Sequence, residues 1–180
     1  MLKYRKTRRR FERSGDVRFL TFSCHQRLPL FNNDAIKDAF VERIARSRER
    51  AAFQLTAWVI MPEHVHLMLI PNLPDHPVSN VLSDLKSMFS RTVLQRWRSM
   101  KAPILSHITD SKGKARFWQV GGGYDRNIIT PAEYEEKLHY IHNNPVTRGL
   151  VESPTDWRWS SARWYSGVRD GELVIDPFTF

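Results

Sequence analysis

The stretch Ala57-Trp58-Val59-Ile60-Met61-Pro62-Glu63-His64-Val65-His66-Leu67-Met68-Leu69-Ile70-Pro71 is the part of the sequence around which the rest is organised. It consists of two apolar runs interrupted at Met61-Pro62-Glu63, a pattern typical of two strands joined by a turn. Because alternate strand residues point to one face, His64 and His66 are predicted to project together as a pair of metal ligands. A half-exposed polar face is the alternative reading of such a pair.

Composition indicates one basic globular domain. The chain has 180 residues, of which 41% are hydrophobic and 12% aromatic, enough apolar material for a core. Its 28 lysines and arginines exceed its 19 aspartates and glutamates, which gives a formal net charge of +9. This surplus favours polyanionic partners, nucleic acid before anionic membrane, although a solvated basic surface would give the same count.

Cysteine usage and hydropathy bear on the compartment. The single cysteine, Cys24, excludes an internal disulfide framework and a cysteine-rich zinc site, and it suits a reducing environment. No apolar run approaches the roughly 18 residues of a membrane span, and the basic N-terminus lacks the apolar segment of a signal peptide. We therefore expect a cytoplasmic protein with no membrane partner.

Hydrophobic periodicity predicts a mixed succession of strands and helices on both sides of the opening stretch. Candidate N-caps precede the first helix, and apolar residues recur at three- and four-residue spacing in the second. The expected elements are a buried strand at 17–23, a helix from residue 34 to about 50, a strand pair at 53–61 and 63–70, an amphipathic helix at 78–97, a loop at 100–115 and an extended segment with a glycine turn at 117–128.

A last helix has the clearest local signal. Thr130-Pro131-Ala132-Glu133 supplies an N-cap threonine, a proline at the first helical position and a glutamate three residues after the cap. The helix is expected to begin at Pro131. It should stop near Asn143 or Asn144, because Pro145 disfavours helical geometry in the preceding residue and has no amide hydrogen.

This helix has an apolar stripe and a separate polar flank. Tyr134, Leu138 and Ile141 form the stripe. At ~100° per residue, Tyr140 and Asn144 lie one turn apart on a different flank, so the core does not need Tyr140. Taken singly, a helical tyrosine is usually a packing residue and an asparagine before proline usually ends a helix.

The combination of two histidines, a tyrosine and an asparagine suits metal-assisted phosphoryl transfer. Two neutral imidazoles and an amide oxygen leave coordination positions open for phosphate oxygens, and the ion then acts as a Lewis acid. The tyrosine would be the nucleophile. Since a phenol is weak at neutral pH, the ion and nearby cations must stabilise the developing charge.

Two further segments combine arginine with aromatic residues. Residues 3–13 carry seven lysines and arginines together with Tyr4 and Phe11, which suits either a phosphate-binding arm or a solvated tail. Residues 156–166 place Trp157, Trp159 and Trp164 among arginines and serines. These aromatics could stack on bases, or they could cap the core.

In order and spacing, these features resemble the single-tyrosine HUH transposases of the IS200/IS605 type, and more closely their relatives, the REP-associated tyrosine transposases. The similarity covers roughly residues 17–165. The residues that carry it are Ala57 to His66, Leu85-Lys86-Ser87, Phe117-Trp118-Gln119, Tyr140 to Val146, Arg148 to Val151 and Trp157 to Ser161.

The resemblance implies an α+β fold, a ferredoxin-like sandwich with an antiparallel sheet. It implies that His64, His66 and Asn144 bind Mg²⁺ or Mn²⁺ and that Tyr140 is the catalytic nucleophile. The implied reaction cleaves single-stranded DNA near a hairpin, which gives a 5′-phosphotyrosine and a free 3′-OH that can rejoin strands. The partner would be DNA with REP-like or inverted-repeat hairpins, bound by a monomer or a homodimer in the cytoplasm, in association with the nucleoid.

The chain is accordingly divided into a basic N-terminal arm at 1–16, an HUH transposase domain at 17–166 that includes the aromatic and basic C-terminal segment, and a C-terminal tail at 167–180. A catalytically silent binding protein or regulator of structured repeat DNA or RNA is the main alternative, and a basic metal-binding scaffold is a third. The candidate DNA contacts are Lys86, Arg91, Arg126, Arg148, Arg5, Arg8 and Arg9.

Overall fold

The structure, a computed structural model, describes residues 12–121, 123–169, 171, 173–176 and 178–180. Apart from two short helices, its first part runs β1–α1–β2–β3–α2–β4, and the sheet order is β2-β3-β1-β4 with every pair antiparallel. This succession and strand order define the predicted ferredoxin-like α+β sandwich. The bounds are β1 Val17–Ser23, α1 Asp34–Ala51, β2 Gln54–Ile60, β3 His64–Ile70, α2 Val78–Ser99 and β4 Tyr124–Ile128.

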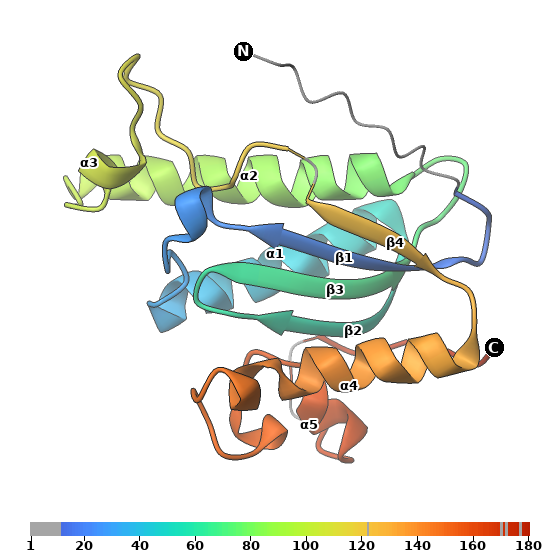
Figure 1. Ribbon diagram of the computed structural model, residues 1–180. Helices are drawn as coiled ribbons and strands as arrows, with labels where there is room; N and C mark the ends of the chain where they lie inside the picture. The colour runs from blue at the N-terminus through green and yellow to red at the C-terminus, as the bar shows by residue number, and fades with distance from the viewer. Residues whose placement is uncertain (1–11, 122, 170, 172, 177) are drawn as a thin grey trace, which may run out of the picture.

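The two faces of the sheet are covered by different helices (Figure 1). Alternation along β1 sends Leu20 and Phe22 into a core shared with α1 and α2, and Val17 and Phe19 into a second core. The second core is closed by α4, Pro131–Thr147, whose stripe of Tyr134, Leu138 and Ile141 is buried as predicted. The helix that carries Tyr140 therefore lies on the face of the sheet opposite α1 and α2.

The start of β4 requires a glycine. Gly123 has a φ of +75°, and a Cβ built there would lie 2.1 Å from the backbone oxygen of Thr21. A side chain at this position would thus push β4 away from β1, where Tyr124 pairs with Thr21. The glycine turn foreseen before this strand allows the close approach of the two strands.

Two predicted boundaries are wrong. Helix α4 does not stop before Pro145 but continues to Thr147. The proline removes only its own amide bond, and the final turn is completed because Arg148 N donates to Asn144 O and Leu150 N donates to Pro145 O. The predicted loop 100–115 contains the short helix α3, Leu105–Ile108, which forms because Ile108 is buried against the main core.

The segments after α4 close the edge of the sheet next to β2. They contain the one-turn helices η2 (Pro154–Asp156) and α5 (Ala162–Tyr165). Trp157 Nε1 donates to Ile60 O, Trp159 Nε1 donates to Asp38, and Tyr165 donates to Thr56 O, so these aromatics cap the core. Beyond them, Leu173 and Ile175 are buried, and Asp176 N donates to Leu55 O.

The basic N-terminal arm and the absence of a membrane span were also predicted from the sequence. Arg5, Arg8 and Arg9 of the predicted basic arm lie outside the described residues. Within the described ranges, none of the helices has the length and apolar character needed to cross a bilayer.

Candidate metal and nucleophile site

His64 and His66 lie at the start of β3 and face α4. They pair across the sheet with Ser23 and Thr21 of β1. Both are buried, at 5% and 3% exposure, and their Nε2 atoms lie 2.9 Å apart. The prediction that they project together is confirmed, and the alternative of a half-exposed polar face is wrong.

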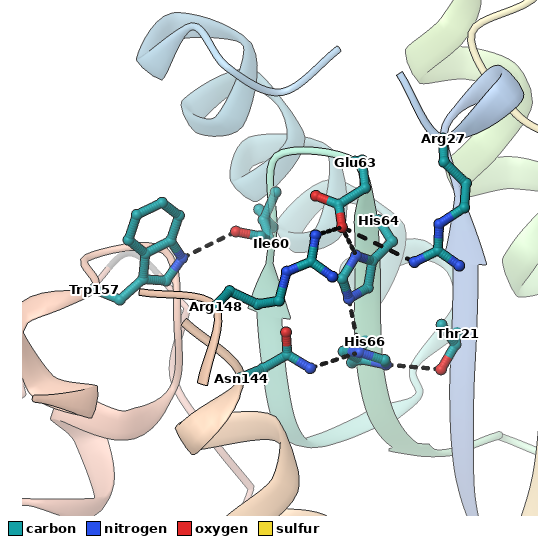
Figure 2. Close-up of polar contacts among 9 residues, drawn as sticks. All are labelled: Thr21, Arg27, Ile60, Glu63, His64, His66, Asn144, Arg148 and Trp157. Carbon is teal, nitrogen blue, oxygen red and sulfur yellow. Dashed lines mark hydrogen bonds and ion pairs between the residues drawn. The ribbon is translucent and has the colours of Figure 1, made fainter. Parts of the chain in front are cut away.

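Each imidazole is held by a partner on its other nitrogen (Figure 2). Glu63 Oε1 lies 3.1 Å from His64 Nδ1, and Thr21 Oγ1 lies 2.7 Å from His66 Nδ1. Because a carboxylate only accepts, His64 Nδ1 carries the hydrogen and donates it, which leaves a lone pair on His64 Nε2. Burial lowers the pKa of His64 and lowers that of His66 to about 3, so both rings are neutral at pH 7.

Asn144 brings an amide from α4 to the same point. Its Nδ2 lies 3.3 Å from His66 Nε2, while its Oδ1 is buried and has no hydrogen-bond partner in the described part of the chain. The oxygen and nitrogen of an amide are assigned from their contacts, and the reversed amide would turn the orphaned oxygen toward the two imidazoles. With Thr21 Oγ1 as the acceptor of its Nδ1 hydrogen, His66 also has a lone pair on Nε2, and two such nitrogens 2.9 Å apart together with a buried amide oxygen fit a divalent cation.

Asn144 would be important for metal binding because no carboxylate joins the two histidines as a third ligand among the described residues. Within the described residues, no group of three or more histidine, cysteine, aspartate or glutamate side chains is arranged to hold a metal ion. Beside the two imidazoles, Asn144 offers this cavity a buried amide oxygen as a further donor.

Tyr140 lies beside the histidine pair on α4. Its ring is 5.2 Å from that of His66, centroid to centroid, and packs edge-on against it and against Phe19. Half of the residue is exposed, so its hydroxyl is not committed to the core. His64, His66, Tyr140 and Asn144 all line one cavity of about 760 Å³, and a single chain supplies all four.

The same cavity is lined by three cationic side chains, those of Arg27, Lys137 and Arg148. Arg148 Nη2 lies 2.9 Å from Glu63 Oε1, and Arg27 Nη2 approaches that oxygen to 3.9 Å from the other side. The sequence predicted Arg148 but not Arg27 or Lys137. Lys137 was detectable, since it precedes Tyr140 by three residues and so lies on the same helical flank.

The other described DNA-contact candidates lie elsewhere. Arg126 forms an ion pair with Glu133 at 2.6 Å, at the start of α4. Lys86 and Arg91 belong to α2, on the opposite face of the sheet, where Lys86 Nζ donates to Gly121 O. None of the three lines the cavity.

The sequence model of the family described as "Transposase IS200 like" matches residues 19–144, a span that includes both histidines, Tyr140 and Asn144. The chain belongs to the IS200-like transposase family. A REP-associated tyrosine transposase of Escherichia coli K12 is 28% identical to this chain over 171 residues, which are 93% of this chain and 88% of the relative. A Haemophilus influenzae relative, provisionally named as the same kind of protein, is 27% identical over 155 residues, 86% of this chain and 83% of its own length.

The fold of this chain is also found in a solved structure. A REP-associated tyrosine transposase bound to a REP hairpin aligns with a TM-score of 0.69 at 22% identity, over 100% of this chain and 95% of that chain. The ferredoxin-like sandwich with its antiparallel sheet is therefore shared, and the resemblance to the REP-associated group is confirmed.

Proposed function

We propose that this transposase is a metal-dependent endonuclease and strand transferase that acts on single-stranded DNA beside a hairpin, with Tyr140 as nucleophile. The observation that carries the proposal is the convergence of two distant elements. The ring of Tyr140 from α4 and that of His66 from β3 lie 5.2 Å apart in a cavity that also holds His64 and Asn144. A nucleophile beside a set of metal donors suits metal-assisted phosphoryl transfer through a covalent intermediate.

His64 Nε2, His66 Nε2 and the Asn144 oxygen would hold the ion. Bound there, Mg²⁺ or Mn²⁺ supplies Lewis-acid stabilisation of phosphate oxygens. Glu63 and Thr21 keep the two rings oriented through their Nδ1 atoms. Of the two ions, Mn²⁺ accepts imidazole ligands more readily, whereas Mg²⁺ strongly prefers oxygen.

The proposed cleavage step uses Tyr140 as the nucleophile. The phenol oxygen forms a bond to phosphorus as its proton leaves to solvent, and the bond from phosphorus to the 3′ oxygen breaks. The 3′ oxygen takes up a proton and becomes a free 3′-OH, while the downstream strand stays on Tyr140 through its 5′-phosphate. Lys137, Arg27 and Arg148 line the cavity and would stabilise the charge on the phosphate. Attack by a 3′-OH reverses the step and joins strands.

Hairpin DNA is the substrate that the charge and the relatives support. The formal net charge of +9 suits a nucleic-acid partner. The structural relative was solved with a REP hairpin. Tyr124, which is 40% exposed, also lines the cavity and offers a ring on which an unpaired base can stack.

The proposal is tested by asking which fragment of the cleaved DNA becomes covalently attached to the protein. A hairpin oligonucleotide with an unpaired flank is labelled at its 5′ end or its 3′ end and incubated with the protein and Mn²⁺. The 5′ label should appear on a shorter free strand, and the 3′ label should migrate with the protein on a denaturing gel. Binding without either product would indicate the silent regulator, and the absence of both binding and products would indicate the metal-binding scaffold.

A further inference from the structure

Two of the motifs that carry the family resemblance do not line the cavity of the histidine pair. They are Leu85-Lys86-Ser87 and Phe117-Trp118-Gln119. The two motifs contact each other, because Trp118 Nε1 donates to Lys86 O at 3.0 Å. Lys86 Nζ in turn donates to Gly121 O at 3.1 Å, so the segment that contains the second motif is attached to α2 at two points of one residue.

On its other side, the second motif is attached to the end of β1. His25 N donates to Phe117 O at 2.8 Å, and Gln119 N donates to Ser23 O at 2.9 Å. These bonds place residues 117–119 between α2 and the turn that follows β1 (Figure 1). The motif is thus held from both sides, and it supports the turn.

This turn, η1 (His25–Arg27), has an unusual backbone conformation. Gln26 and Arg27 have φ values of +52° and +55°, which fall in the left-handed region that residues with side chains rarely adopt. Such a conformation persists only where the surrounding structure fixes it, and it is found most often at functional sites. The contacts around the turn should therefore show what fixes it.

Each backbone amide from residue 24 to residue 28 has an acceptor, and four of the five acceptors are backbone oxygens. The exception is the amide of Gln26, which donates to the side-chain Oε1 of Gln119 at 3.0 Å. Gln26 is the first of the two left-handed residues, so this bond acts where the turn departs from ordinary geometry. Gln119 is therefore the side chain that holds the turn.

The turn directs Arg27 into the cavity, where its side chain extends toward Glu63 and the histidine pair (Figure 2). Arg27 Nη2 lies 3.9 Å from Glu63 Oε1, whereas Arg148 Nη2 lies 2.9 Å from the same oxygen. The side chain of Arg27 is also 65% exposed. Because its pairing with Glu63 is loose, the Arg27 guanidinium is available to an anion that enters the cavity.

We propose that Gln119 is a positioning residue, whose side chain holds the left-handed turn that presents Arg27 to the phosphate attacked by Tyr140. The identity of that phosphate rests on the function proposed above. Gln119 itself does not line the cavity, so it acts through Arg27. Its hold on the turn needs neither DNA nor a metal ion and is therefore measured separately from the reaction.

The first measurement is hydrogen exchange of the Gln26 amide by NMR, with EDTA and without DNA. Exchange should be ~2–10-fold faster in Gln119→Ala than in wild type, the range expected for one hydrogen bond. Gln119→Glu keeps the acceptor and should exchange at close to the wild-type rate. Gln54→Ala, which changes another exposed glutamine on the edge strand β2, should match wild type. An unchanged rate in Gln119→Ala overturns the proposal.

The second measurement is the rate at which the covalent adduct forms with a saturating hairpin oligonucleotide and Mn²⁺. Arg27→Ala should slow it ~10²-fold, the cost of one lost charge-stabilising donor, and Gln119→Ala ~2–10-fold. In the Arg27→Ala background, Gln119→Ala should have no further effect, because the two residues act as a unit. The affinity of Gln119→Ala for Mn²⁺, measured by calorimetry, should equal that of wild type.

Equal slowing by Gln119→Ala in the wild-type and Arg27→Ala backgrounds would show that Gln119 acts independently of Arg27, which overturns the proposal. A loss of Mn²⁺ affinity in Gln119→Ala would also overturn it, since the whole site would then be disturbed. Absence of an adduct in wild-type protein would instead overturn the proposed function, and the exchange of the Gln26 amide would still decide whether Gln119 holds the turn.

Discussion

The carboxylate of Glu63 lies beside the ring of His64, with Oε1 3.1 Å from Nδ1. Glu63 is itself buried and also accepts from Arg148 at 2.9 Å. This contact fixes the hydrogen of His64 on Nδ1 and turns the lone pair of Nε2 toward His66 and Asn144. Glu63 thus orients His64, which is a metal ligand in the proposed function.

Removing this support should weaken metal binding. In Glu63→Ala, the affinity for Mn²⁺ measured by calorimetry without DNA should fall ~10–100-fold, the usual cost of losing such a partner. Glu63→Gln keeps an acceptor and should lose less. Glu136→Ala is the control, because Glu136 also lines the cavity but pairs with Lys137. An unchanged affinity in Glu63→Ala would show that His64 needs no partner.

Asn144 should act as an oxygen donor. Asn144→Asp replaces the amide by a charged oxygen ligand, so Mn²⁺ should bind at least as tightly as in wild type, whereas Asn144→Ala should bind it more weakly. Asn143→Ala changes an exposed neighbour in the same cavity and should have little effect. The titration is followed by the electron paramagnetic resonance signal of free Mn²⁺. Equal affinities for the Ala and Asp variants would exclude Asn144 from the donor set.

His142 should make stability depend on pH. It is on the far side of α4, where its Nε2 lies 2.9 Å from Ser161 Oγ, and burial lowers its pKa from the ordinary 6.5 to about 4. The unfolded chain takes up a proton below about pH 6.5 while the folded ring stays neutral. Its contribution is therefore present above pH 6.5 and is lost as pH falls toward 4, by at most ~1.4 kcal/mol per pH unit.

Urea unfolding at pH 7.5, 6 and 5 with EDTA checks this dependence. The variant His142→Gln should lose less stability between pH 7.5 and 5 than wild type does, because its side chain does not titrate. His107→Gln, at an exposed position, should follow wild type. Parallel curves for wild type and His142→Gln would contradict the assignment.

The approach of β4 to β1 should tolerate no side chain at residue 123. Gly123→Ala combines a positive φ with a Cβ only 2.1 Å from Thr21 O, whereas Gly15→Ala has a φ of +87° and open space. Both should lose about 1 kcal/mol from backbone strain, and Gly123→Ala should lose at least ~1 kcal/mol more through overpacking. Chemical denaturation measures the difference, and equal losses would show that the strands separate without cost.

The sequence predicted those parts of the fold and of the site that depend on residues close together along the chain. Strand alternation placed His64 and His66 on one face, and the Thr130 cap placed the start of α4, because both rules act within a few residues. The flank shared by Tyr140 and Asn144 followed from helical geometry in the same way.

Contacts set by the pairing of distant strands were not predictable. Thr21 reaches His66 only because β1 pairs with β3, and Arg27 reaches Glu63 only because the turn after β1 folds over the end of that pair. At Pro145 a local rule was overridden, since the later amides of Arg148 and Leu150 complete the final turn of α4. The sequence signals for such positions were therefore weak or misleading.

The most direct test of the central claim is the mass of the protein after incubation with a hairpin oligonucleotide and Mn²⁺. Wild type and Tyr124→Phe, a control that changes another tyrosine of the cavity, should gain the mass of the downstream strand on the peptide that contains Tyr140. Tyr140→Phe should bind the hairpin and gain nothing. An adduct of wild-type yield on Tyr140→Phe would contradict the assignment of the nucleophile.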